Sequence, residues 1–126
     1  MEKKKIYLAG SFLNFRDKII SELGYKYEFA DPRKNRQHSI ATLVVDDMGK
    51  AKECPIMLAC FPKGNSRGTM TYAEIGGSRA KGNYIIIADE TDKRDEFLDS
   101  ISDSKLNSID DAINFLKKKN MKTILS

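Results

Sequence analysis

Glu74 is the residue whose type and position most directly suggest chemistry. It follows a loop over 62–68 that contains two glycines, and it falls in the first turns of a helix predicted over 69–81. The start of a helix carries positive potential, which stabilises a carboxylate that can act as a nucleophile. The following Ile75-Gly76-Gly77 allows another backbone to approach closely. An exposed glutamate near a helix start is the plainer interpretation, and composition alone does not exclude it.

A second candidate site is the turn after the first apolar run. Gly10 and Ser11 end this run and offer backbone N–H groups and a hydroxyl, which suit a phosphate at a strand-to-helix turn. Arg16 and Arg33 could add a bidentate grip on the same phosphate. Each arginine taken alone also fits an ordinary surface position. We predict an anion site here, formed by Ser11, Arg16 and Ser66.

Other reactive side chains are few. Asp46 and Asp47 lie on the predicted helix before the central apolar strand, where one of them could bind a base or a sugar, although a solvated helix face is the commoner case. One histidine, His38, and no Cys-x-x-Cys pattern disfavour a metal cluster or a serine triad. Cys54 and Cys60 lie at opposite ends of one predicted strand, too far apart for a disulfide.

The apolar pattern predicts a doubly wound α/β domain of the flavodoxin-like or Rossmann-like type. Three uninterrupted apolar runs, over 5–9, 55–61 and 84–88, are typical of buried parallel strands. Segment 25–30 is a further strand candidate, and 97–102 a fifth, at the edge. The alternation of strands and helices implies a mostly parallel sheet of four or five strands, covered on both faces. Helices are predicted over 15–23, 40–52, 69–81 and 108–119.

Three segments should converge on one crevice. In open parallel sheets, ligands bind at the carboxyl ends of the strands. The segments Gly10-Ser11-Phe12, 31–33 and 62–68 each follow a predicted strand. The chain, residues 1–126, has the length of a single domain, so we expect one crevice and one site.

Composition and charge narrow the classes of function. The net charge of +4 suits an anionic small molecule. Much of the excess lies in two lysine tracts, at 3–5 and 117–119, which are usually solubilising and count weakly towards nucleic-acid binding. No apolar run reaches the ~20 residues that span a bilayer, and the basic start lacks the longer apolar stretch of a signal peptide. We expect a cytoplasmic protein with no membrane partner.

Three stretches of sequence resemble the nucleoside 2-deoxyribosyltransferase family, which includes the 2'-deoxynucleoside 5'-monophosphate N-glycosidases. The most specific is the Glu-Ile-Gly-x-x-x-Ala-x-Gly pattern ahead of an apolar strand, and the similarity covers roughly residues 5 to 90. The matching stretches are Ile6-Tyr7-Leu8-Ala9-Gly10-Ser11-Phe12, the run 47–58 that begins Asp47-Met48-Gly49, and Gly68-Thr69 with Ala73-Glu74-Ile75-Gly76 and Ala80-Lys81-Gly82.

The resemblance implies roles for individual residues. Glu74 would be the nucleophile that attacks the anomeric carbon and forms a glycosyl-enzyme intermediate, while Asp47 would hold or protonate the leaving base. The family often has an aspartate shortly before its nucleophile, but this chain has Asn65 and Ser66 there. No metal or other cofactor is required. The residues expected to contact the substrate are Tyr7, Gly10, Ser11, Phe12, Arg16, Asp31, Asn65, Ser66 and Gly68.

The same resemblance implies a homodimer or larger homo-oligomer, because family sites often borrow residues from a neighbouring subunit. The helix around Glu74 and Gly77 would then pack against the partner. The substrate would be a nucleoside or its 5'-monophosphate, with either water or a second base accepting the sugar. Two other classes of function stay open: a non-catalytic nucleotide-binding sensor, which would not need Glu74, and a nucleic-acid-binding domain. The latter is disfavoured because the aromatic residues form no evident stacking platform.

Overall fold

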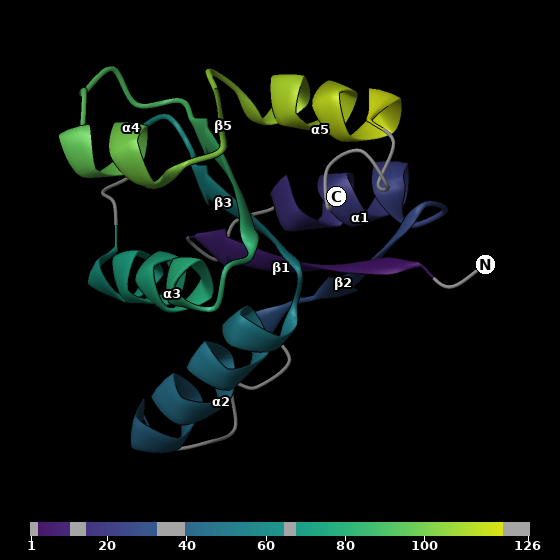
Figure 1. Ribbon diagram of the computed structural model, residues 1–126. Coiled ribbons are helices and arrows are strands. Elements are labelled where there is room, and N and C mark those ends of the chain that lie inside the picture. Colours follow the sequence, from purple (N-terminus) through teal and green to yellow (C-terminus); the bar gives the residue numbers. More distant parts are fainter. Residues whose placement is uncertain (1–2, 11–14, 33–39, 65–67, 120–126) are drawn as a thin grey trace.

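The computed structural model describes residues 3–10, 15–32, 40–64 and 68–119. Within this part of the chain, one sheet of five parallel strands lies between two layers of helices (Figure 1). The strand order is β2-β1-β3-β4-β5, which confirms the predicted doubly wound sheet. The strands are β1 Lys4–Gly10, β2 Tyr27–Ala30, β3 Ile56–Phe61, β4 Tyr84–Asp89 and β5 Ser104–Leu106, and the helices are α1 Phe15–Leu23, α2 Ile40–Glu53, α3 Thr69–Ala80, α4 Glu96–Ile101 and α5 Ile109–Lys118.

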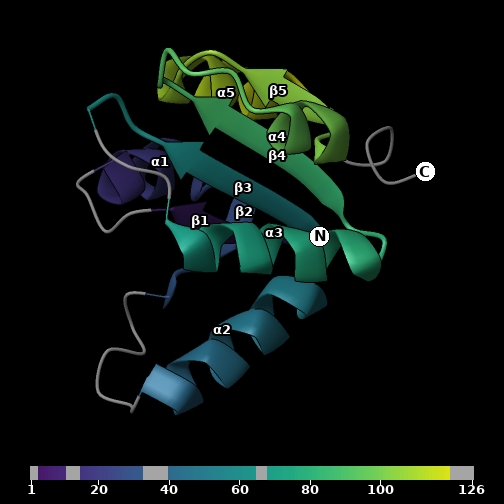
Figure 2. The same ribbon diagram turned by 90° about the vertical axis from the view of Figure 1, so that its left-hand side faces the viewer.

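The central strands are buried on both faces, which explains their uninterrupted apolar runs. Alternate side chains of a strand point to opposite faces, so Leu8 and Leu58 belong to the core under α1 and α5. Tyr7 and Met57 belong to the second core, to which α2, α3 and α4 contribute. Figure 2 shows α2 and α3 on one side of the sheet, with α1 and α5 on the other. Even-numbered side chains of the buried part of β1 therefore face α1, and odd-numbered ones face α3.

The winding of the chain reverses between β1 and β3. From β1 the chain runs through α1 to β2 at one edge, whereas β3 leads through α3 to β4 on the other side. Such a switch point is where ligands bind in open α/β sheets. Strand β1 also extends beyond β2: its last pair with β2 is Tyr7 with Ala30, but its pairing with β3 continues to Gly10 and Cys60.

The prediction of an edge strand over 97–102 is wrong, because this segment forms α4. Asp95 caps the helix by accepting a hydrogen bond from the backbone N–H of Leu98 at 3.1 Å. Leu98 is fully buried against the sheet. The edge strand comes later, at β5, beside β4. Its three residues are too few to show an alternating pattern in the sequence.

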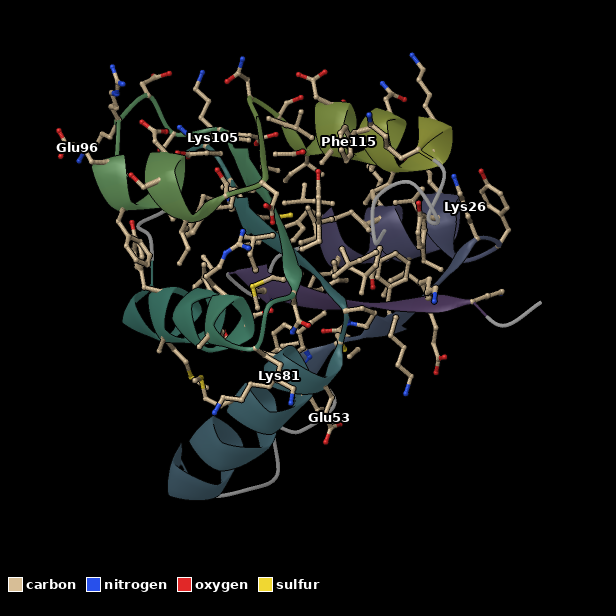
Figure 3. The ribbon with its side chains drawn as sticks, viewed as in Figure 1. Lys26, Glu53, Lys81, Glu96, Lys105 and Phe115 are labelled. Atoms are coloured by element: carbon tan, nitrogen blue, oxygen red, sulfur yellow. The ribbon has the colours of Figure 1, made fainter. Side chains whose placement is uncertain are left out.

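Helices α2 and α3 pack closely through a glycine. A Cβ atom on Gly77 would lie 2.7 Å from Cε of Met48, so Gly77 accommodates a side chain of the same chain. The expected contact of the helix around Glu74 and Gly77 with a partner subunit stays a prediction. Charged side chains such as Glu53 and Lys81 extend outward from these helices (Figure 3). None of the described helices has both the length and the apolar character needed to cross a membrane.

Candidate active site

Glu74 and Tyr7 meet in the core between α3 and the sheet. Tyr7 lies in the middle of β1 and points to the face that α3 covers. Its hydroxyl donates a hydrogen bond to Oε2 of Glu74. Tyr7 has no exposed surface and Glu74 is only 5% exposed, so the interpretation of Glu74 as an exposed helix residue is wrong. A buried phenol and a buried carboxylate each need a polar partner, and each supplies it to the other.

Burial is the main reason why the pKa of Glu74 is raised to about 7. The hydrogen bond from Tyr7 lowers this pKa because it stabilises the anion, the negative charge of Asp47 raises it, and the charge of Arg16 lowers it. The pKa of Tyr7 is raised far above its ordinary value, first by burial and then by the charge of Glu74. Near neutral pH Glu74 therefore exists in both protonation states, while Tyr7 remains a hydrogen-bond donor.

The helix start contributes less to this site than the sequence suggests. Glu74 is the sixth residue of α3, and the first turn contains no acidic residue. The positive potential of a helix terminus fades beyond its first turn. Tyr7, not the terminus of α3, is the group that holds the carboxylate.

Asp47 approaches the same place from α2. Its side chain is 4% exposed, and its charge raises the pKa of both Glu74 and Tyr7. The next residue, Met48, fills the space over Gly77, which brings α2 against α3. The site thus combines two buried carboxyl groups and a phenol from three elements, a set that can provide a nucleophile and a proton donor. Among the described residues, no cluster of His, Cys, Asp and Glu could hold a metal ion.

Known structures share this architecture. No family model and no curated protein matches the sequence. The 2-deoxyribosyltransferase of Bacillus psychrosaccharolyticus matches with a TM-score of 0.74 and 18% identity over 95% of each chain. A CMP N-glycosidase from Clostridium botulinum matches with a TM-score of 0.59 and 22% identity, over 90% of this chain and 99% of the other. A 2-deoxyribosyltransferase from Leishmania mexicana gives 0.60 and 15%, over 77% and 70%.

The protein has the 2-deoxyribosyltransferase fold. The resemblance seen in the sequence is thereby supported at the level of the fold, since these identities are low. Within this fold Gly10 ends β1 with a φ of 128°, and a Cβ atom there would lie 2.3 Å from the carbonyl oxygen of Cys60. Only glycine fits this position. Gly68, another expected contact, immediately precedes α3 and is exposed.

The structure argues against Arg16 as a phosphate ligand. Its side chain has no exposed surface. The guanidinium donates hydrogen bonds to the carbonyl oxygens of Leu8 at 2.9 Å and Gly10 at 2.7 Å, and it pairs with Asp31 at 3.3 Å. Asp31, also expected to contact the substrate, is 7% exposed and engaged by Arg16. Both residues therefore act inside the protein, next to the end of β1.

Several expected site residues lie outside the described part of the chain. These are Ser11, Phe12, Asn65 and Ser66, together with Arg33 and His38. Their roles stay predictions. Tyr7 was expected as a substrate contact, and its contact in the structure is the carboxylate of Glu74.

One residue near the loops was not predicted. Glu90 directly follows β4 and accepts hydrogen bonds from the backbone N–H of Lys63 at 3.3 Å and of Ile109 at 3.0 Å. It therefore ties the loop after β3 to the start of α5. The signal in the sequence is an acidic residue directly after the buried run 84–88 and Asp89, at the edge where the loops gather.

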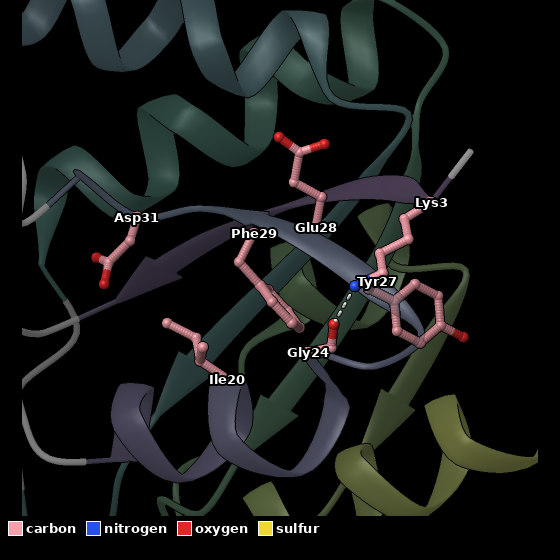
Figure 4. A pocket seen from close by; sticks show the side chains of 7 residues that line it. All are labelled: Lys3, Ile20, Gly24, Tyr27, Glu28, Phe29 and Asp31. Atoms are coloured by element: carbon pink, nitrogen blue, oxygen red, sulfur yellow. Dashed lines mark hydrogen bonds between the residues drawn. The ribbon is translucent and has the colours of Figure 1, made fainter. Parts of the chain in front are cut away.

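Open pockets flank the edge strand β2. Figure 4 shows one of about 490 Å³ on the α1 side, where Ile20 and Phe29 lie on its wall. A second, of about 290 Å³, lies between β2 and α2 and includes Cys54 and Asp31. Cys54 and Cys60 are both free and buried. Glu74 lines neither pocket, so these hollows are separate from the site around it.

Proposed function

We propose that the protein cleaves or transfers the N-glycosidic bond of a nucleoside or nucleoside 5'-monophosphate, with Glu74 as nucleophile. The observation that carries this proposal is the buried hydrogen bond between Tyr7 and Glu74, with Asp47 beside it; Tyr7 lies on β1, one of the two strands between which the winding reverses. The likeness to two 2-deoxyribosyltransferases and a CMP N-glycosidase supports the choice of reaction. On this proposal the protein belongs to the same family as those enzymes.

The first step forms a covalent intermediate. One oxygen of the Glu74 carboxylate attacks the anomeric carbon, a C–O bond forms, and the C–N bond to the base breaks. The bonding electron pair stays on the base nitrogen, which takes a proton. Asp47 is the proposed proton donor. Asp47 can give this proton only in the form in which it is protonated and Glu74 is ionised, so the reactive form of the pair carries a single proton, on Asp47.

The second step releases the sugar. Water or a second base attacks the anomeric carbon and gives its proton to Asp47, which the first step left as a carboxylate, while the bond to Glu74 breaks and the Glu74 carboxylate is restored. Two displacements at one carbon retain the β configuration. Tyr7 hydrogen-bonds the carboxylate in the free protein and can orient the attacking oxygen. Because Arg16 is engaged inside the protein, the proposal assigns it no phosphate and covers both nucleosides and monophosphates.

The proposal includes a homo-oligomer. Glu74 and Tyr7 lie deep beside α3. A domain of 126 residues encloses a bound nucleoside only in part, and a second copy would cover the rest. The outer surface of α3 offers a contact for a second copy: Gly76 has no atom within 4 Å of its Cβ position, and Met70 is exposed. Light scattering at micromolar concentration tests this part, and a monomer would contradict it.

The test of the reaction is a panel of nucleosides and 5'-monophosphates, with the free base measured by chromatography, with and without a second base. We expect base release from at least one substrate class. Glu74→Gln should lower the rate by several orders of magnitude while binding survives, because the covalent step has no substitute group. Glu53→Gln, an exposed change on α2, is the matched control and should keep full activity. Full activity in Glu74→Gln, or binding without base release, would indicate the sensor instead.

A further inference from the structure

Strand β1 has two backbone carbonyl groups that no neighbouring strand covers. Residues two apart in a strand direct their carbonyls to the same edge. Leu8 and Gly10 lie beyond the last pair between β1 and β2, which joins Tyr7 to Ala30. Their carbonyls therefore face the space that β2 would fill if it were longer. Buried carbonyl groups need a donor, so this edge requires a substitute for β2.

Arg16 is that substitute. Its Nη1 donates to Leu8 at 2.9 Å and its Nη2 to Gly10 at 2.7 Å, so one guanidinium covers both carbonyls. Asp31, the residue directly after β2, accepts from Nη1 at 3.3 Å. The guanidinium lies at the level of the sheet itself, not on the α1 face alone. For this reason its positive charge reaches the α3 face, where Glu74 lies.

The charges around Glu74 can be named element by element. Strand β1 contributes the phenol of Tyr7, α2 contributes Asp47, and α1 contributes Arg16. Strands β3 and β4 contribute uncharged side chains to this core, namely Met57, Ala59, Phe61, Ile85 and Ile87. Burial and Asp47 both oppose ionisation of Glu74. Among the residues that the structure describes, Arg16 is the cation whose charge opposes them.

We propose that Arg16 is a positioning residue: it replaces the missing end of β2 along β1, fixes the backbone of Leu8 and Gly10, which follow Tyr7 on the strand, and stabilises the anionic form of Glu74. Asp31 moderates this effect by neutralising part of the Arg16 charge. The inference rests on the proposed function where it makes Glu74 a nucleophile. Its electrostatic part concerns the protein without substrate and can be tested independently of activity.

The direct test is NMR titration of the side-chain carboxyl of Glu74 in protein with ¹³C-labelled glutamate, assigned by the signal that Glu74→Gln removes. In the parent protein we expect a pKa of about 7. We expect Arg16→Met to raise this pKa, Asp31→Asn to lower it, and Arg16→Lys to leave it near the parent value because the charge is kept. Arg79→Met is the matched control: Arg79 also bonds a carbonyl, of Ile101, and a carboxylate, of Asp103, but it should not move the pKa.

The pKa of Glu74 should shift in opposite directions in Arg16→Met and Asp31→Asn, and this separates an electrostatic role from a merely structural one. If Arg16→Met folds and the pKa of Glu74 is unchanged, or if Asp31→Asn raises it, the inference is wrong. If Arg16→Met does not fold, Asp31→Asn decides alone. Where the reaction is detected, kcat/KM of Arg16→Met should approach the parent value as the pH rises. Damage to the fold alone would lower kcat/KM equally at every pH. Shifts in the titration without any reaction would contradict the proposed function and leave the electrostatic role of Arg16 standing.

Discussion

The phenol of Tyr7 and the carboxylate of Glu74 are 67 residues apart in the sequence and share one buried hydrogen bond in the structure. The bond joins the centre of β1 to α3 across the core. It also fixes which form of Glu74 the protein favours, because the donor stabilises the anion while burial penalises it. The chemistry of the site depends on this balance.

Removal of the phenol should shift the balance towards the acid. Tyr7→Phe keeps the ring and loses the donor, so the pKa of Glu74 should rise above about 7. Only the anion attacks, so kcat/KM rises as the pH passes through this pKa, and the rise should move to higher pH in the variant. A pH profile of base release measures this shift. Tyr27→Phe removes another buried hydroxyl, bonded to Leu116 at 2.7 Å, and should cost about 1 kcal/mol of stability without moving the profile.

Asp47 should affect both the pKa of Glu74 and departure of the base. Asp47→Asn removes a charge that raises the pKa of Glu74, so this pKa should fall. Loss of a general acid typically lowers turnover by about 10²–10⁴-fold. The loss should shrink for a substrate whose leaving group departs without a proton, such as a nitrophenyl glycoside. Asp110→Asn, on the exposed surface of α5, is the control. An equal loss on both kinds of substrate would exclude the acid role.

The stability of the protein should depend on pH through Glu74. Its pKa is raised to about 7 in the folded state from its ordinary value of 4.5, which we take for the unfolded chain. Between these values the folded state binds more protons, so the free energy of unfolding falls as the pH rises through this window. The full effect is on the order of 3 kcal/mol. Glu74→Gln, which cannot ionise, should therefore unfold at a higher temperature than the parent above pH 7, with the difference narrowing towards pH 5. Thermal unfolding followed by circular dichroism checks this, and an unchanged difference across the range would contradict it.

Two glycine-to-alanine substitutions should change stability in opposite directions, and this prediction does not depend on the proposed function. Gly10→Ala should destabilise strongly, because φ is 128° and the new Cβ would lie 2.3 Å from the backbone of Cys60. The backbone conformation alone costs about 1–3 kcal/mol. Gly76→Ala meets no atom within 4 Å and should stabilise α3 by about 0.5–1 kcal/mol. Urea unfolding of both variants tests the pair. A loss of stability in Gly76→Ala would instead indicate that a second copy covers this face.

The sequence predicts the sheet well and the contacts around the site only in part. Runs 5–9, 55–61 and 84–88 become β1, β3 and β4 because strands buried on both faces carry no polar interruption. The segment 97–102 could not be assigned from its few apolar residues, and the cap at Asp95 made it a helix. Short segments leave the choice of helix or strand to such local contacts.

Glu74 and Asp47 could be singled out, but their partners could not. The contact with Tyr7 requires the strand order, since β1 lies under α3 only because it pairs with β3. A tyrosine within a fully buried run does signal that its hydroxyl needs a partner. The expected role of Arg16 failed for a related reason. Its burial follows from β2 ending at Ala30 while β1 continues, and that difference in length is not visible in the sequence.

The covalent intermediate is the last prediction, and it can be observed directly. A 2-fluoro-substituted nucleoside analogue should slow release of the sugar more than its attachment, so the glycosyl-enzyme accumulates. The fluorine withdraws charge from an oxocarbenium-like transition state, and attack by the anchored carboxylate suffers less than attack by a free acceptor. Mass spectrometry of the digested protein should then locate one sugar on the peptide that contains Glu74. Glu74→Gln should carry no label, and Glu53→Gln should be labelled like the parent. A label on another residue would assign the nucleophile elsewhere, and product of inverted configuration would replace the covalent step by direct attack of water.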